Sequence, residues 1–564
     1  MIVHPSSLAP RPKATFLDLP LELRQQVYHD YFKVDGGYVY DGDSDKLVRA
    51  DGQPISMSLR YACRYVAEET KSIPFKLNSI TFSALYRKDL QHQAAIHSNL
   101  IRFHSVLLSE LLLRMRYFVT PEMFDQVDEV APHYLQKIKS RISSCIREDE
   151  YEDSEDNGSL FDREDFQDVT EFDEMGGGVV ACLDWNDSTV GFQLAIICIL
   201  RQVTAKNSAE TAKAIDEVLP GWKDSASPEE LFDLSFDHWD IPSLSRLSET
   251  AERLQRHHFL DSLSKWLPVQ RKSNPALFDA RYKGPKYLYR RKYWFSATAV
   301  AIRFLTRMSS TQRGYLQKLI LNEDRIAVGF PESHSIGMIS FCKQNPKLHV
   351  EQRVDVWQNL VMSSESPSAY RPIGIYFERS EPEAGEGHYM DSISGPDQDV
   401  FFSNWVVHGM EVVRAGMPVG SWSVVFDGNP DLNLATDLFA TILKRTIVWQ
   451  TFYTDCVSLG LFADPSHADY PFATIAASEE SPTESKRSSI FQCNFNLDRP
   501  WNLDEIAADH NVHKEAFKWK LDSWLDVEIS LNSPDPLRFS MLNPTIDLEK
   551  LRLSCFERKM IADH

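Results

Sequence analysis

One stretch of this chain, residues 148–174, limits how the rest can fold. It contains 14 acidic residues and a single arginine, and it alone accounts for −13 of the net charge of −21. Like charges at this density repel one another, so the stretch is predicted to be an extended, disordered linker. Three glycines at 176–178 close it. The chain is therefore expected to fold in separate parts on either side.

The remaining sequence is rich enough in apolar residues for several folded units. Of its 564 residues, 43% are hydrophobic and 11% are aromatic, and this length suggests about three or four domains. The predicted fold class is α+β, with a small helical N-terminal domain before a larger mixed α+β body. The expected divisions are a disordered tail (1–15), the N-terminal domain (16–85), a helical segment (86–147), the acidic linker (148–178), a central α+β domain (179–465), a second linker (466–490) and a C-terminal segment (491–564).

No export signal or membrane span is predicted. The most apolar run, residues 190–200, has eleven residues, whereas a helix needs about 20 to cross a bilayer. The eight cysteines are widely spaced and form no Cys-x-x-Cys pair, so neither a zinc site nor a disulfide framework is expected. The expectation is a cytoplasmic or nuclear protein with reduced thiols, no metal and no cofactor.

An amphipathic helix is predicted near the start of the chain, within FLDLPLELRQQVYHDYF (16–32). Pro20 suits the first helical position, because its missing N–H would be unpaired there anyway. Arg24 is expected on the solvated face. The apolar face is expected to consist of Leu23, Val27 and Tyr31, with Tyr28 and Phe32 beside them. That face must be covered, either by the rest of the chain or by a partner protein.

The Leu-Pro-x-Glu-Leu-Arg core of this stretch resembles the F-box-like opening of large families of fungal proteins. Residues 58–84 resemble the companion segment of those families, in which a Leu-x-x-x-Cys-Arg helix precedes a short strand. Here the helix is expected to place Leu59 on its apolar face and to end at Pro74, before a strand at 78–82. Residues 293–360 resemble a further block of one such family.

What the resemblance implies is a protein-interaction role without enzymatic activity. An F-box would imply binding to an adaptor subunit of a cullin–RING ubiquitin ligase, with this chain as a substrate receptor. The polar insertion at 33–56 departs from a compact F-box, and it leaves open whether the first helix packs on its own domain or docks on an adaptor. No membrane partner is expected. The implied partner-binding residues are Leu19, Pro20, Leu23, Val27 and Leu59.

Two other functions stay open from the sequence alone. The central body, 179–465, is large enough to be an enzyme, and it should then contain a pocket with converging His, Asp or Cys side chains. Residues 281–295 contain six Lys or Arg, six aromatic residues and no acidic residue, a pattern that suits single-stranded nucleic acid. A loop leading into the next helix, or attraction to the acidic linker, explains this segment more simply.

Three shorter motifs are interpreted as structural. Residues 41–52 place Asp at the first, third and fifth positions of a calcium loop but lack its central Gly and final Glu, so a solvated hairpin loop is predicted. Cys342, eight residues after His334, lies among apolar residues and is predicted to be a buried thiol. Residues 420–424 lack the second Gly of a nucleophile elbow, and residues 421–426 alternate like a strand.

Overall fold

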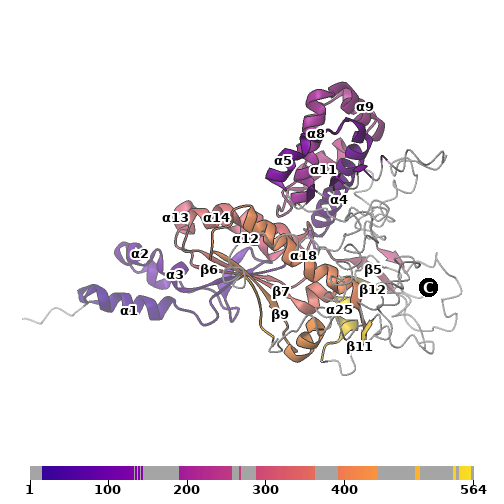
Figure 1. The fold of residues 1–564 in the computed structure, drawn as a ribbon. Coiled ribbons are helices and arrows are strands. Elements are labelled where there is room, and N and C mark those ends of the chain that lie inside the picture. The colour runs from indigo at the N-terminus through magenta and orange to yellow at the C-terminus, as the bar shows by residue number, and fades with distance from the viewer. Residues whose placement is uncertain are drawn as a thin grey trace, which may run out of the picture.

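The computed structural model of this chain contains three groups of elements: a small helical module, a central sheet with its covering helices, and a helical lobe (Figure 1). The predicted tail, the acidic linker, nearly all of the second linker and most of the C-terminal segment lie outside the described residues. The structure describes residues 15–131, 190–256, 266–268, 287–362, 392–440, 490–495, 538–540 and 545–560, together with a few residues between 134 and 146.

The central sheet has seven strands, and they follow one another across the sheet almost in chain order. The spatial order is β10-β9-β7-β6-β3-β1-β2. Neighbouring strands are parallel from β10 to β1, and β2 joins β1 in an antiparallel hairpin. The strands are β1 (Tyr38–Asp41), β2 (Lys46–Arg49), β3 (Ile80–Ser83), β6 (Lys318–Glu323), β7 (His349–Asp355), β9 (Trp422–Asp427) and β10 (Phe491–Cys493). The predicted α+β class is confirmed, and the strand predicted at 421–426 corresponds to β9.

Helices cover one face of this sheet. Parallel strands that advance in one direction return by crossovers on the same side, because such crossovers are right-handed. Figure 1 accordingly shows α12, α14 and α18 together on one face. In β6 and β7 every second residue is buried, and the residues between them are partly exposed. The covering elements are α12 (Ala297–Arg307), α13 (Ser310–Arg313), the 3-10 segment η10 (Pro331–Met338), α14 (Ile339–Gln344), the π-helical turn η11 (Val356–Val361) and α18 (Gly395–Arg414).

The helical lobe is inserted between β3 and β6. Its first helix, α4, begins in the sheet core and continues into a second core inside the lobe. The apolar run at 190–200 lies in α8 and contributes most of its side chains to that second core. None of the described helices combines the length and apolar character needed to cross a bilayer. The lobe consists of α4 (Gln91–Arg114), η3 (Arg116–Phe118), α5 (Met123–Val130), α8 (Val190–Lys206), α9 (Ser208–Val218), η7 (Trp222–Asp224), α10 (Pro228–Phe232) and α11 (Leu244–Arg253).

The predicted boundaries at residue 85 and at 179–465 do not separate units of the fold. The strands β1 to β3 lie in the same sheet as β6 and β7, while α8 to α11 pack with α4 in the lobe. Pairing between strands so distant in the chain leaves no local sequence pattern, which is why the predicted boundaries were misplaced. Two small sheets complete the described fold: β4 (Leu267–Pro268), β5 (Tyr287–Arg291) and β12 (Phe556–Met560), which follows α25 (Leu548–Ser554); and β8 (Ser392–Ser394) with β11 (Arg538–Ser540).

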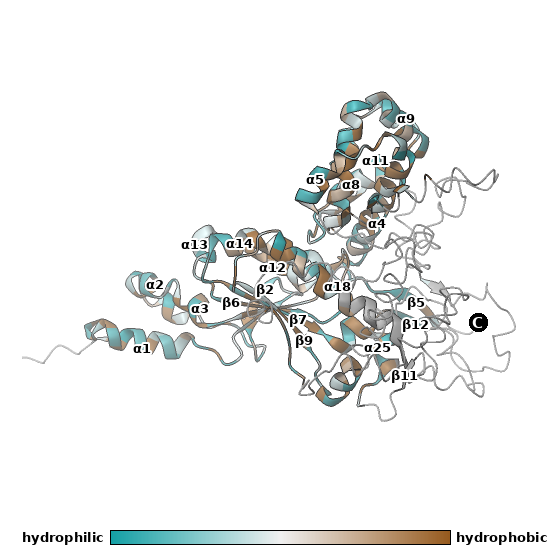
Figure 2. Ribbon diagram, in the orientation of Figure 1, coloured by the Kyte–Doolittle hydropathy of each residue, from teal (hydrophilic) through white to brown (hydrophobic). Residues whose placement is uncertain are grey.

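The helical module precedes the sheet and extends from one end of it (Figure 2). Pro74, predicted to end the companion helix, lies instead in the first turn of α3, a position where a missing N–H is tolerated. The companion segment is thus two short helices instead of one. The module contains η1 (Phe16–Asp18), α1 (Leu21–Phe32), η2 (Ser58–Tyr61), α2 (Arg64–Thr70) and α3 (Ile73–Leu77).

Candidate protein-docking surface

The helix α1 begins one residue later than predicted. Pro20 is its N-cap, with an extended backbone at φ −51° and ψ 150°. Immediately before it, the single turn of η1 is closed by Asp18, whose carboxylate accepts hydrogen bonds from the N–H and the hydroxyl of Thr15 at 2.7 and 2.9 Å. The Leu-Pro pair is therefore the joint between two helical segments.

The buried face of α1 consists of Arg24, Tyr28 and Phe32, at every fourth position. Tyr28 is fully buried, and its ring centre lies 5.6 Å from that of Phe16. This small core is separate from the cores of the sheet and the lobe. Its other members are Val66, Met57, Leu59, Ile73 and Leu77. The prediction that Arg24 would be solvated is wrong.

Arg24 is buried because its guanidinium joins three parts of the module. Two of its nitrogens donate to the carboxylate of Glu69 on α2, at 3.1 and 2.8 Å, and the third donates to the carbonyls of Leu19 and Leu17, at 2.6 and 3.3 Å. The hydroxyl of Tyr28 donates to the same carboxylate at 2.7 Å. The bonds from Arg24 lower the pKa of Glu69, and burial raises the pKa of Tyr28 to about 12. The carboxylate is therefore ionised and the phenol protonated at neutral pH.

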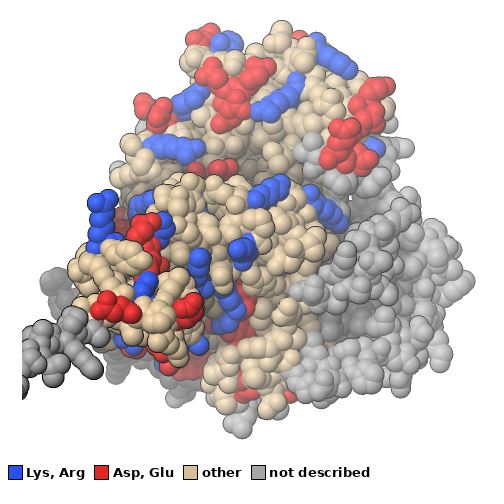
Figure 3. Space-filling view, turned by 90° about the vertical axis from the view of Figure 1, so that its left-hand side faces the viewer, with Lys and Arg blue, Asp and Glu red and all other residues tan. Residues whose placement is uncertain are grey.

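A second face of α1 is apolar and exposed. Leu23, Val27 and Tyr31 recur on it at every fourth position and are 48%, 42% and 38% exposed, and Leu19, four residues before Leu23 and just ahead of the helix, is 37% exposed. We call these four residues the α1 stripe. Leu17 and Leu21 are each 45% exposed as well. Figure 3 looks at the end of the molecule that carries the module, where uncharged surface lies between flanking charges. Several exposed apolar side chains on one side of a helix are typical of a protein-interaction site.

Four of the five predicted partner-binding residues lie at this surface. Leu19, Leu23 and Val27 belong to the α1 stripe, and Pro20 is exposed beside Leu19. Leu59 is different, because it is half-buried and packs against the core of the module. It helps to position the α2 segment and is not part of the exposed surface.

Two exposed tyrosines were not predicted as part of the surface. Tyr61 is 84% exposed and Tyr65 is 56% exposed. The guanidinium of Arg24 lies over the Tyr65 ring, 5.7 Å from its centre, so Tyr65 adjoins the corner where Arg24 holds the carbonyl of Leu19. The sequence could have indicated their exposure, because Tyr61 and Tyr65 are two and six residues after Leu59. This spacing places both tyrosines outside the predicted apolar face of the helix that contains Leu59.

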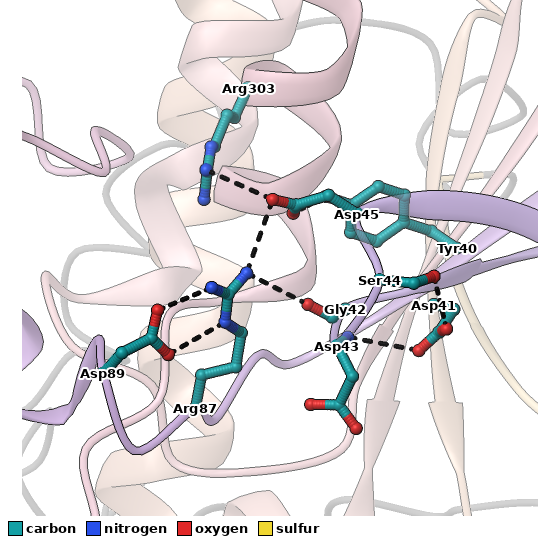
Figure 4. A network of polar contacts seen from close by, with 9 residues as sticks. All are labelled: Tyr40, Asp41, Gly42, Asp43, Ser44, Asp45, Arg87, Asp89 and Arg303. Atoms are coloured by element: carbon teal, nitrogen blue, oxygen red, sulfur yellow. Dashed lines mark hydrogen bonds and ion pairs between the residues drawn. The ribbon is translucent and has the colours of Figure 1, made fainter.

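Residues 41–52 contain the predicted hairpin turn, whose residues 43–45 are exposed, but residues 46–49 form strand β2, and the side chain of Asp45 contacts the sheet body (Figure 4). Asp45 has a left-handed backbone, with φ of 54°. Its carboxylate accepts a hydrogen bond from the hydroxyl of Tyr40 at 2.6 Å and lies 3.4 Å from Arg87 and 3.8 Å from Arg303. Among the described residues, no group of three His, Cys, Asp or Glu side chains is arranged to hold a metal ion.

Cys342 and His334 are both buried. Cys342 is fully buried, and burial raises the pKa of its thiol to about 11. His334 is 1% exposed; its Nε2 lies 2.7 Å from the carbonyl of Gly329 and its Nδ1 lies 2.7 Å from the hydroxyl of Ser296. Because a carbonyl only accepts, Nε2 carries the proton and Ser296 donates to Nδ1. Burial lowers the pKa of His334 to about 4, so this pair is a neutral structural contact.

A cavity inside the helical lobe brings two histidines, His104 and His238, close to Gln193. The Nε2 atom of His104 lies 3.0 Å from the carbonyl of Leu231, and burial lowers the pKa of both histidines. The rest of the lining is mostly apolar and includes no carboxylate and no thiol. The hydrogen-bond partners of the two histidines, the carbonyl of Leu231 and the side-chain oxygen of Gln193 at 3.4 Å from Nε2 of His238, are groups of the lobe itself.

The described part of the basic segment 281–295 is occupied by contacts within the chain. It forms strand β5, paired with β12. The guanidinium of Arg290 donates to Glu557 at 2.6 Å, and the ammonium of Lys292 donates to the carbonyl of Ser554 at 3.0 Å. These cations are directed at the chain's own groups, and they do not form the free basic row that nucleic-acid binding requires.

No protein-family model, no curated protein and no solved structure matches this chain. Its function must therefore be argued from its own residues.

Proposed function

We propose that this chain is a protein-interaction protein whose α1 stripe docks on an adaptor subunit of a cullin–RING ubiquitin ligase, with the rest of the chain acting as a substrate receptor. The observation that carries the proposal is that α1 has two apolar faces, one packed on its own module and one exposed. Arg24, Tyr28 and Phe32 pack the helix onto its own module, while Leu23 and Val27 are exposed. The fit to an F-box-like opening comes from the Leu-Pro-x-Glu-Leu-Arg sequence that this helix carries.

Apolar side chains at every fourth position of a helix suit a groove on a partner. Burying a Leu or Val side chain contributes about 1.5–3 kcal/mol. The four members of the α1 stripe are already more than half buried, so covering them contributes less than this per side chain, and other contacts with the adaptor have to supply the rest of the several kcal/mol that association costs. No rearrangement of the module is needed, because its internal packing uses the other face.

The insertion at 33–56 is compatible with this proposal. It forms the β1–β2 hairpin, which joins the central sheet. The helix after it, α2, still packs against α1, since Val66 and Glu69 both contact the buried face. The chain between α1 and α2 is therefore longer than in a compact F-box, yet the two helices stay together.

The test is direct binding of the full-length chain to a purified adaptor subunit, measured by calorimetry. Leu23→Asp places a charge in the middle of the α1 stripe, and we expect it to weaken binding at least about tenfold, since a buried unpaired charge is strongly unfavourable. Gln26→Asp adds the same charge to the same helix outside the stripe, and we expect less than about a twofold effect.

Because Leu23 is 48% exposed, both variants should unfold at the same temperature as the unmodified chain. Equal adaptor binding by the two variants, or no binding of the unmodified chain, would contradict the proposal.

A further inference from the structure

The two ends of the parallel strands carry different ionisable residues. At the carboxyl end, four strands finish in an acidic residue that accepts a hydrogen bond from a backbone N–H of a following turn or a neighbouring helix start. Such bonds use the carboxylates to cap local structure. The four residues are Asp41, Glu323, Asp355 and Asp427.

The amino end of the sheet carries lysines instead. Lys76 lies in the last turn of α3, just before β3, and Lys343 lies in the last turn of α14, before β7. Lys347 lies in the turn that leads into β7, and Lys318 is the first residue of β6. We call these four residues the basic rim. Figure 3 faces this end, and it shows Lys and Arg side chains gathered across the middle of the surface, next to the helical module.

Lys318 is only partly neutralised. Its ammonium lies 2.7 Å from the carboxylate of Glu351, but the same carboxylate also accepts a hydrogen bond from Arg353 at 2.6 Å. Two cations thus share one acid, and their side chains remain 42% and 40% exposed. This pair adds a net positive charge to the rim.

The other three lysines of the basic rim are exposed. Among the described residues, no carboxylate lies within 4.0 Å of the ammonium of Lys76, Lys343 or Lys347. Lys76 stands over the ring of Tyr315, 5.6 Å from its centre, which connects the module to the sheet body. Complementing a helix dipole explains the positions of Lys76 and Lys343. It does not explain Lys318 and Lys347, which lie outside helices.

We propose that the basic rim binds an acidic polypeptide segment of a partner protein. In a chain with a net charge of −21, four lysines, three of which have no carboxylate within 4.0 Å among the described residues, create a local positive potential that selects a short acidic segment. A continuous phosphate backbone would be repelled by the rest of the surface. Tyr315, the described ring beneath Lys76, is half-buried, so it offers no open face for base stacking. The rim does not include the α1 stripe, so this inference stands apart from adaptor docking.

The test uses the full-length chain and a fluorescein-labelled peptide of alternating Glu and Asp, followed by fluorescence polarisation at low ionic strength. The rim variant combines Lys343→Glu with Lys347→Glu. The matched control combines Lys206→Glu with Lys213→Glu in the lobe. It changes the net charge equally, and Lys206 lies in the last turn of its helix, as Lys343 does.

We expect the rim variant to bind the peptide about tenfold more weakly and the control to change binding less than about twofold. Leu23→Asp should leave peptide binding unchanged, which separates this result from the adaptor test. Equal losses in the rim variant and the control would overturn the inference, and so would tighter binding of a single-stranded oligonucleotide than of the peptide.

Discussion

Two apolar side chains of α1, five residues apart, should respond differently to truncation. Phe32 is 2% exposed and packs inside the module, so Phe32→Ala should destabilise the protein by about 3–5 kcal/mol. Val27 is 42% exposed, so Val27→Ala should change stability by less than about 0.5 kcal/mol. Denaturant unfolding of both variants measures the contrast. Similar losses would mean that the α1 stripe is buried in solution.

At the residue scale, the sequence identified the members of the α1 stripe but did not indicate whether this face or the Tyr28 face is buried. Leu23 and Val27 on one face and Tyr28 and Phe32 on the other recur with the same period of four, so helical spacing alone does not say which face is inside. The decision depends on Arg24. An arginine in a helix is ordinarily read as solvated, and its partner Glu69 lies 45 residues away in the chain, beyond any local pattern.

At the scale of elements, the joint between the lobe and the sheet body contains three buried histidines. They are His97 on α4, His238 after α10 and His334 on η10, and none is more than 3% exposed. Burial lowers the pKa of His97 to about 3 and of His334 to about 4, and it lowers the pKa of His238 as well. In the unfolded chain each would have a pKa of about 6.5.

The joint should therefore be sensitive to acid. Since the folded pKa values lie below the unfolded one, these groups favour the folded state fully above about pH 6.5, and this contribution is lost as the pH falls toward about 4. His97→Phe removes one titrating group and suits the site, where the ring already packs against Phe236 and Phe295. We expect its melting temperature to fall less steeply with acid than that of the unmodified chain.

The matched control for this experiment is His29→Phe, a substitution on the exposed side of α1. It shows what the loss of a histidine outside the joint does to the curve. Parallel curves for His97→Phe and the unmodified chain would show that the buried ring does not contribute to acid sensitivity.

Individual helices and strands were predicted better than the packing between them. The helix over α4, the strand at β9 and the hairpin of β1 and β2 follow from local periodicity and turn residues. The contact of α4 with both the sheet core and the lobe core does not, because its apolar positions continue without a break from one core to the other. The sequence of α4 therefore does not indicate where the sheet core ends and the lobe core begins.

At the scale of the whole molecule, cutting the chain at residue 85 should not yield two folded parts. Strand β3 lies between β1 and β6, and its Ile80 and Phe82 are fully buried. A fragment of residues 86–564 would lose three strands and expose the edge of β6, which favours aggregation. Size-exclusion chromatography and thermal unfolding test this expectation. A monomeric fragment that unfolds cooperatively would contradict it.

The α+β class was within reach of sequence reasoning because helical and alternating segments can be recognised separately. The way they assemble was not. Strand β3 pairs with β6 although the whole lobe lies between them in the chain. The acidic stretch also lies between them, and it therefore predicted a boundary between domains. Composition indicates where a chain cannot form a core, but it does not reveal which segments on either side of a gap belong to one sheet.

The order of the strands has a consequence for how the molecule is made. During synthesis, each new parallel strand of this sheet can pair with an edge strand that has already formed. In the described sheet no strand has to be inserted between two strands that are already paired. The lobe delays the synthesis of β6 relative to β3, but β3 remains the edge strand with which β6 pairs. Assembly can thus keep pace with the ribosome, growing at one border from the first hairpin to the last strand.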